Sequence, residues 1–221
     1  MTIPEYKCNE GPNTDVFNDC LKPTDVFLKF IEPQLENLVY QSNLHAVQRD
    51  RNLNFKKEEL LDSIGTNLLM GYHVLPSWRH YWSGSSDLGV PLVSNTISRQ
   101  IFDNILSNLH INDNPKIPVS NKDKLYKLKP MIDSLNETFR AFSKATRHLT
   151  IDESMITFKG RSSIKQYNPM KPIKRGYEIW CCADQKGYIL HFDIYQGKEE
   201  GNDNEPELTD WVLGEKVVLK L

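Results

Sequence analysis

The sequence has little that would tie it to a membrane or to the cell exterior. It contains no apolar run that approaches the roughly 20 residues needed to cross a bilayer, and its polar N-terminus resembles neither a signal peptide nor an anchor. The four cysteines form no CxxC pair, and no histidine stands at zinc-finger spacing from them. We therefore expect free thiols in a reducing compartment and a soluble, intracellular protein without a membrane partner.

The chain also lacks an excess of either charge. Its 27 basic and 29 acidic residues give a net charge of −2, so any attraction to nucleic acid must come from a local patch. One such patch exists, because residues 154–177 contain no acid at all. The basic residues of this stretch, called the basic ribbon (159–175) below, are Lys159, Arg161, Lys165, Lys171, Lys174 and Arg175. They suit contact with phosphates; a solvated loop that keeps a strand soluble is the alternative.

The first part of the chain, about residues 25–145, has a helical period. We expect a short helix capped by Thr24 or Asp25, a new helix whose first turn contains Pro33, and a later helix capped by Ser94. Pro130 should kink a further helix or begin its second segment. The aromatic cluster near residue 80 and the histidines show no ligand spacing, and we interpret both as packing residues.

Residues 149–196 change to a period of two, which predicts three antiparallel strands. Asp184 and Gly187 stand where a hairpin turn between the last two strands needs them. The first strand contains Asp152 and Glu153, and alternation places these two acids on opposite faces of the sheet. The basic ribbon connects this strand to the second. The sequence therefore predicts an α+β protein, with a helical N-terminal region followed by a few antiparallel strands.

Several stretches resemble, in order and in spacing, the piggyBac transposase family and its element-derived relatives. They are "LLMGYHVLPSWRHYWS" at 68–83, "ISRQIFDNILSNLHINDN" at 97–114, "DKLYKLKPMIDSLNETF" at 123–139, "LTIDESMITFKGRSSIKQYNPMKPIKRGYEIWCCADQKGYILHFDIYQGK" at 149–198 and "LGEKVVLKL" at 213–221. The resemblance implies a loose lead-in at 1–22, a helical dimerisation and DNA-binding region at 23–146, and a partial RNase H-like catalytic core at 147–221. It also implies DNA as partner, a homodimer, a nuclear location and no small-molecule substrate.

The resemblance maps Asp152 onto the first aspartate of the family's catalytic triad, inside the "IDE" motif. In the family this acid helps to hold Mg²⁺, and a pair of such ions activates one oxygen and stabilises another during DNA strand cleavage and joining. The second and third aspartates of the family pattern are absent from this sequence, so the RNase H-like core is expected to be incomplete. We therefore expect this fragment to bind no Mg²⁺ and not to catalyse the parent reaction.

Three functions remain open at this point. The chain is a truncated or degenerate transposase without activity, a domesticated DNA-binding module that uses the basic ribbon, or a protein-interaction module built on the helical region. Magnesium-dependent nicking, salt-dependent DNA binding and DNA-independent dimers distinguish them.

Overall fold

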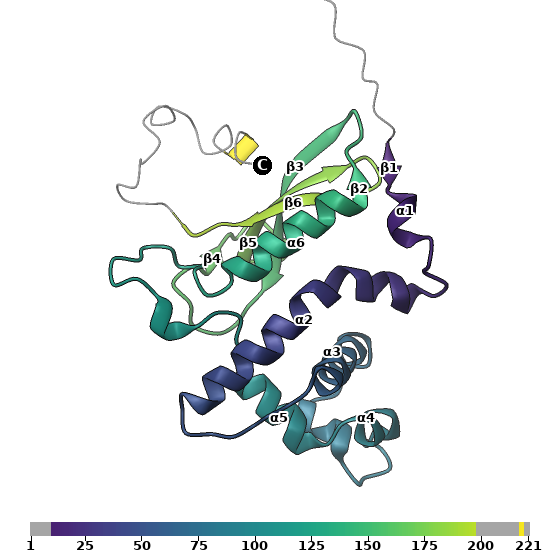
Figure 1. The fold of residues 1–221 in the computed structure, drawn as a ribbon, viewed down its shortest axis with the longest axis vertical. Helices are drawn as coiled ribbons and strands as arrows, with labels where there is room; N and C mark the ends of the chain where they lie inside the picture. Colours follow the sequence, from purple (N-terminus) through teal and green to yellow (C-terminus); the bar gives the residue numbers. More distant parts are fainter. Residues whose placement is uncertain (1–9, 198–216, 219–221) are drawn as a thin grey trace, which may run out of the picture. The chain divides into compact units, whose positions relative to one another are not determined.

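The computed structural model describes residues 10–197 and 217–218 (Figure 1). By its internal contacts the chain divides into two compact units. Within the described part, the sheet unit contains residues 10–30, 122–125, 131–197 and 217–218, and the helical unit contains residues 31–121 and 126–130. The sequence prediction placed the boundary between a helical region and a catalytic core at residue 146. That boundary assigns functions to the two parts, which internal contacts do not test, so it stays a prediction. Most of the helix expected around Pro130 belongs by contacts to the sheet unit.

The helical unit is built from helices joined by short loops. Its elements are most of α2 (Pro23–Val47), α3 (Lys57–Tyr72), η1 (Trp78–Trp82), α4 (Pro91–Thr96), α5 (Arg99–Asn108) and η2 (Asn114–Lys116). Its buried core comprises Leu35, Leu38, Phe55, Leu60, Ile97, Phe102 and Ile105. The rings of Trp78 and Trp82 pack on Phe102 with centroids 5.8 and 5.1 Å away. The expected packing role of the aromatic cluster is therefore confirmed.

Two histidines of this unit lie face to face. The rings of His45 and His110 are stacked at 3.7 Å with an interplanar angle of 4°. The Ser42 hydroxyl donates to the carbonyl of His110 and accepts from its backbone N–H, at 3.2 and 2.9 Å. Burial lowers the pKa of His45, and the positive charges of His110, Arg49, Lys127 and Arg51 lower it further.

The helix boundaries differ from the expected ones at two places. One continuous helix, α2, passes through Pro33, where a new helix was expected. A proline inside a helix costs a hydrogen bond, and the burial of Leu35 and Leu38 just after it compensates. The expected cap Ser94 lies inside α4, because Pro91 already begins that helix.

The next helix, α5, is capped instead by Ser98, whose hydroxyl accepts the N–H of Ile101 at 3.3 Å. The two open possibilities for Pro130 resolve in favour of a helix start, since Pro130 stands in the first turn of α6 (Lys129–Phe142).

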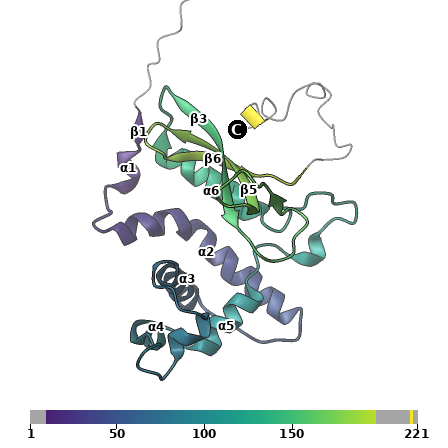
Figure 2. The ribbon, with the colours of Figure 1, turned by 180° about the vertical axis from the view of Figure 1, so that it is seen from behind.

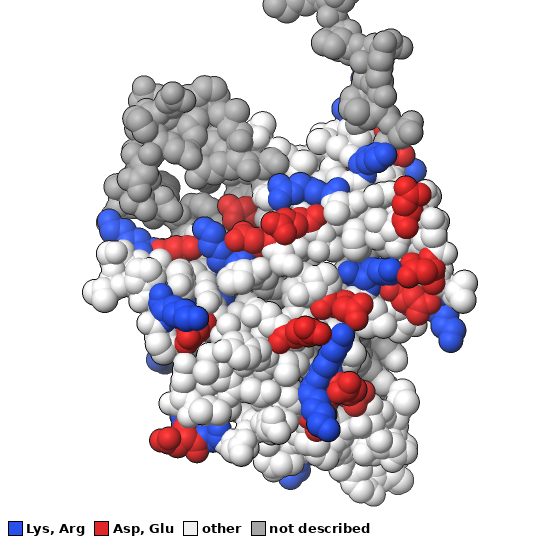
Figure 3. All heavy atoms as spheres, viewed as in Figure 1, with Lys and Arg blue, Asp and Glu red and all other residues white. Residues whose placement is uncertain are grey.

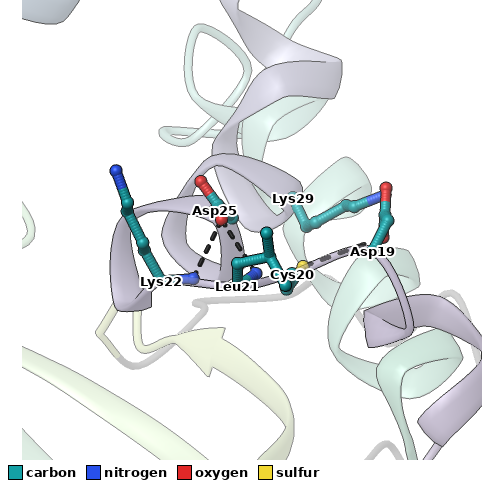
Figure 4. Close-up of polar contacts among 6 residues, drawn as sticks. All are labelled: Asp19, Cys20, Leu21, Lys22, Asp25 and Lys29. Atoms are coloured by element: carbon teal, nitrogen blue, oxygen red, sulfur yellow. Dashed lines mark hydrogen bonds and ion pairs between the residues drawn. The ribbon is translucent and has the colours of Figure 1, made fainter.

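Asp25 caps the start of α2, although it lies inside the first turn of the helix and not at the position before it. Figure 4 shows its carboxylate reaching back over the first turn, where Oδ2 accepts the N–H groups of Leu21 and Lys22, both at 2.9 Å. Beside it, Lys29 forms an ion pair with Asp19 at 2.8 Å. These contacts satisfy N–H groups at the point where the chain enters the helix.

The sheet unit contains a four-stranded antiparallel sheet. Its strands are β3 (Leu149–Thr157), β4 (Gln166–Tyr167), β5 (Arg175–Asp184) and β6 (Ile189–Ile194). β5 is central: β3 pairs along one edge, and β4 and β6 pair at successive places on the other. The three long strands and their order along the chain agree with the sequence prediction, whereas β4 was not expected. A further short pair, β1 (Gly11–Pro12) with β2 (Ser143–Lys144), lies next to α1 (Thr14–Phe17).

Helix α6 covers this sheet, in front of it in Figure 1 and behind it in Figure 2. The ring of Phe139 packs on that of Phe192 at 5.9 Å. The buried side chain of Asn136 donates to the carbonyl of Phe192 and accepts from its N–H, both at 2.9 Å. One amide therefore satisfies both backbone groups of a β6 residue that would otherwise be unpaired at the sheet edge.

The hairpin between β5 and β6 is formed by the two residues that the sequence indicated. Asp184 is buried, and its Oδ1 accepts the N–H groups of Lys186 and Tyr188 at 2.8 and 2.9 Å. Gly187 adopts φ +84°, a conformation that side chains disfavour. The stretch 213–221, quoted above for the family resemblance, falls largely outside the described residues; within it, Val217 and Val218 are helical.

The described helices include none that combines the length and the apolar character of a membrane span. On the face drawn in Figure 3, basic and acidic side chains intermingle over both units, without a large area of one sign.

Candidate functional site

Asp152 lies in the middle of β3 with its carboxylate exposed. Its Oδ1 accepts the N–H of Glu153 at 2.8 Å. Across the sheet, Asp152 stands directly opposite Cys181, so the two side chains share one face. Burial raises the pKa of the Cys181 thiol, and the negative charge of Asp152 raises it further. The thiol is thus a neighbour that senses the charge at position 152.

Glu153 lies on the opposite face of the sheet, as strand alternation predicted. It stands opposite Trp180 and forms an ion pair with Lys171 of the basic ribbon. Burial raises the pKa of Glu178, which shares this face; the charge of Glu153 raises it further, and Lys171 opposes both effects. Two carboxyl groups and one ammonium group therefore cluster on the face that does not carry Asp152.

The basic ribbon is a folded segment. The backbone N–H of Phe158, just before it, donates to the carbonyl of Arg175 at 3.4 Å, and the rings of Phe158 and Tyr177 stack at 4.8 Å. Within the ribbon, β4 pairs with the start of β5, and Ile164 is buried. Tyr177 thus has a packing role, whereas Tyr167 is 61% exposed.

A close backbone contact fixes the place where the ribbon re-enters the sheet. A Cβ atom at Gly176 would lie 1.9 Å from the carbonyl oxygen of Ile156 on β3. No side chain fits at that distance, so the position requires glycine. Gly176 therefore fixes the register of β5 against the strand that carries Asp152.

The six basic residues of the ribbon have different environments. Four of them, Lys159, Arg161, Lys174 and Arg175, are exposed. The other two are half-buried: Lys165 donates through Nζ to the carbonyl of Gly160 at 2.6 Å, and Lys171 pairs with Glu153. The guanidinium of Arg175 lies over the ring of Tyr167, 5.1 Å from its centroid. The sequence alone did not distinguish these six residues from one another. In the part of the chain that the structure describes, Lys171 differs from the other five because it has a carboxylate partner, Glu153.

The other strand acids do not join Asp152. Asp184 stands opposite Leu149, and Asp193 stands opposite Trp180, which places both on the face of Glu153. The carboxylate of Asp184 is moreover used by the hairpin. Within the described ranges, no three His, Cys, Asp or Glu side chains converge as metal ligands. The donors around Asp152 therefore do not fit a metal pair by themselves.

The sequence reasoning missed the ion pair between Glu153 and Lys171. The sequence did indicate that Glu153 needs a partner other than the metal site, because strand alternation places this acid of "IDE" on the face opposite to Asp152. The partner was not identifiable, because it depends on how the ribbon folds.

Comparisons with known proteins agree over nearly the whole chain. A family model described as Transposase IS4 matches residues 22–221. The human PiggyBac transposable element-derived protein 3 is 35% identical over 212 residues, which is 95% of this chain and 35% of that protein. The human PiggyBac transposable element-derived protein 2 is 33% identical over 184 residues, which is 83% of this chain and 31% of that protein.

One solved structure has a similar fold. It is a piggyBac transposase in a synaptic complex with hairpin DNA, determined by cryo-EM, with a TM-score of 0.78 and 22% identity. The match covers 97% of this chain and 45% of the solved chain. This chain thus spans about a third of the length of the two human relatives and less than half of the solved protein.

Proposed function

The chain belongs to the piggyBac transposase family, and from that premise we propose that its sheet unit is part of an RNase H-like core that acts on DNA. The support is an antiparallel sheet with an exposed acid in its first strand, together with the fold likeness at a TM-score of 0.78. In this proposal the helical unit serves dimerisation and DNA binding, and the protein works in the nucleus.

Asp152 is proposed as the first metal-binding acid of this core. Divalent ions held by converging carboxylates would supply the activation of one oxygen and the stabilisation of another during strand cleavage and joining. A lone carboxylate holds hydrated Mg²⁺ weakly, and the acids on neighbouring strands point to the other face. We therefore expect the 221-residue chain by itself not to cleave DNA, and the separation of the described strand acids is the observation that carries this expectation.

The basic ribbon is proposed as the DNA-contacting segment. Its four exposed cations are free to approach phosphates, and such contacts position a duplex without reading its sequence. Each neutralised phosphate makes binding more dependent on salt. This exposure also favours a second candidate function, a domesticated module that binds DNA without cutting it.

A nicking assay with Mg²⁺ on the purified chain tests the proposal, with Asp152→Ala as the matched variant. We expect no turnover in either protein. Magnesium-dependent cleavage that disappears in the variant would overturn the expected inactivity of this chain.

Cys181 provides a second, independent measurement of metal at position 152. Because the charge of Asp152 raises the pKa of this thiol, Asp152→Asn should accelerate its alkylation, and a cation held by Asp152 should do the same. We expect millimolar Mg²⁺ to leave the rate unchanged. Cys182 is the internal control, since burial alone raises its pKa.

The two candidate functions differ in what replacing Lys174 and Arg175 should do. As a DNA-binding module, the chain binds duplexes with an affinity that falls steeply with salt. Replacing both residues by alanine should then reduce the slope of log affinity against log salt concentration by about two, because two phosphate contacts are lost. Dimers that persist without DNA would instead favour an interaction module built on the helical unit.

A further inference from the structure

The Glu153–Lys171 ion pair connects the back of β3 to the middle of the basic ribbon. The two side chains are 29% and 22% exposed, so solvent screens them less than a surface pair. Glu153 shares the strand of Asp152 but faces away from it. Its carboxylate therefore binds the basic ribbon and does not contribute to the face of Asp152.

Lys171 belongs to a tight turn that joins β4 to β5. The N–H of Asn168 donates to the carbonyl of Lys174 at 2.9 Å, and the N–H of Lys171 donates to the carbonyl of Asn168 at 3.4 Å. Pro169 and Pro172 restrict the backbone on either side of this segment. The side chain of Lys171 is the part of the turn that reaches back to β3.

We propose that Glu153 is a positioning residue: by holding Lys171, it fixes the turn so that the neighbouring cations Lys174 and Arg175 face DNA in one arrangement. This inference rests on the proposed DNA-contacting role of the ribbon. It gives the two acids of "IDE" separate tasks on the two faces of one strand.

The electrostatic surroundings supply a direct readout of this pair. Glu178 lies on the same face, and its pKa is raised by burial and by Glu153 but lowered by Lys171. Glu153→Gln should therefore lower the pKa of Glu178, whereas Lys171→Met should raise it. Two opposite shifts, followed by NMR titration of the Glu178 side chain, would not arise from a general loosening of the fold.

The direction in which Glu153→Gln changes DNA affinity distinguishes a positioning role of Glu153 from a purely electrostatic effect of its charge. Glu153→Gln removes a negative charge and releases a lysine, so charge alone predicts tighter binding. Positioning predicts weaker binding, by about threefold, because a loosened turn must be ordered again on the DNA. Exchange of Glu153 and Lys171 for each other, as Glu153→Lys with Lys171→Glu, should restore wild-type affinity more closely than either single change.

The test combines hydrogen exchange of the free chain with salt titrations of duplex binding. The Asn168 amide should exchange about fivefold faster in Glu153→Gln and in Lys171→Met. Asp152→Asn, which removes the adjacent charge on the other face, should leave that exchange unchanged. Unchanged exchange in Glu153→Gln, or tighter DNA binding by it, overturns the inference. Absence of salt-dependent DNA binding by the wild-type chain overturns the proposed function instead, while the exchange result still decides whether Glu153 fixes the turn.

Discussion

A methyl group added at residue 176 should disrupt the contact between β3 and β5. The Cβ of Gly176→Ala would lie 1.9 Å from the carbonyl oxygen of Ile156, about 1.5 Å short of ordinary contact, and 2.8 Å from its carbonyl carbon. Both atoms are backbone, so no rotamer change relieves the clash. The strands must separate or form a bulge at the pair of Thr157 with Gly176.

The cost can be worked from these contacts. Overpacking of this kind costs about 1–3 kcal/mol, and each ladder hydrogen bond that opens adds about 1 kcal/mol. We therefore expect Gly176→Ala to reduce the free energy of unfolding of the sheet unit by about 3 kcal/mol. Urea unfolding measures the total, and hydrogen exchange of peptides covering 149–157 and 176–184 localises the loss.

The same substitution at Gly65 is the matched control. This glycine lies inside α3, and a Cβ there meets nothing within 4 Å. Gly65→Ala should stabilise the helical unit by about 0.5–1 kcal/mol through helix propensity and a less flexible unfolded chain. If Gly176→Ala were as stable as the wild type and exchanged at the same rate in both strands, the argument for a required glycine would fail.

Two further changes probe contacts in each unit. Asn136→Ala should destabilise the sheet unit by about 2–3 kcal/mol, because it removes two hydrogen bonds and leaves the N–H and carbonyl of Phe192 without their partner; chemical denaturation measures this loss. The helical unit should lose stability as the pH falls from about 7 to about 5, since the pKa of His45 is lowered in the folded state and the unfolded chain takes up the proton more readily. Hydrogen exchange of α2 and α5 as a function of pH measures the second effect.

The controls for these two changes are conservative variants. Asn136→Asp keeps the acceptor for the N–H of Phe192. At a pH where the new carboxyl is protonated, its O–H can also donate to the carbonyl of Phe192 in place of the amide, so the variant should be less damaging there than alanine. His45→Gln removes the titrating group, and its pH profile between 5 and 7 should be flatter. An equally steep profile in His45→Gln would assign the acid sensitivity to other groups.

Strand periodicity was enough to predict the face of each acid in β3. Side chains alternate in any regular strand, so Asp152 and Glu153 had to diverge, and the observed partners Cys181 and Trp180 confirm it. The turn at Asp184 was equally accessible, because its chemistry is local. These features depend only on neighbours in the sequence.

The missed features depend on distant contacts. Local rules favour a new helix at Pro33, yet the buried side chains that follow it keep α2 continuous. Ser94 and Ser98 are equally good caps by residue type, and the start of α4 at Pro91 decides between them. The Glu153–Lys171 pair spans 18 positions, and no local pattern specifies it. Tertiary packing overrides propensity in each case.

The pairing register of β3 against β5 connects the predicted faces of Asp152 and Glu153 to the ion pair with Lys171 that the sequence did not predict. A slip of β3 by one residue would exchange the faces of Asp152 and Glu153, so the separate roles proposed for them require one register. Alternating apolar residues alone specify it weakly, because both faces of β3 carry exposed side chains. Gly176 specifies it strongly: in a slipped sheet, Arg175 or Tyr177 would occupy the position that tolerates no Cβ. The glycine at the end of the basic ribbon therefore determines which acid faces the proposed metal and which one holds the ribbon.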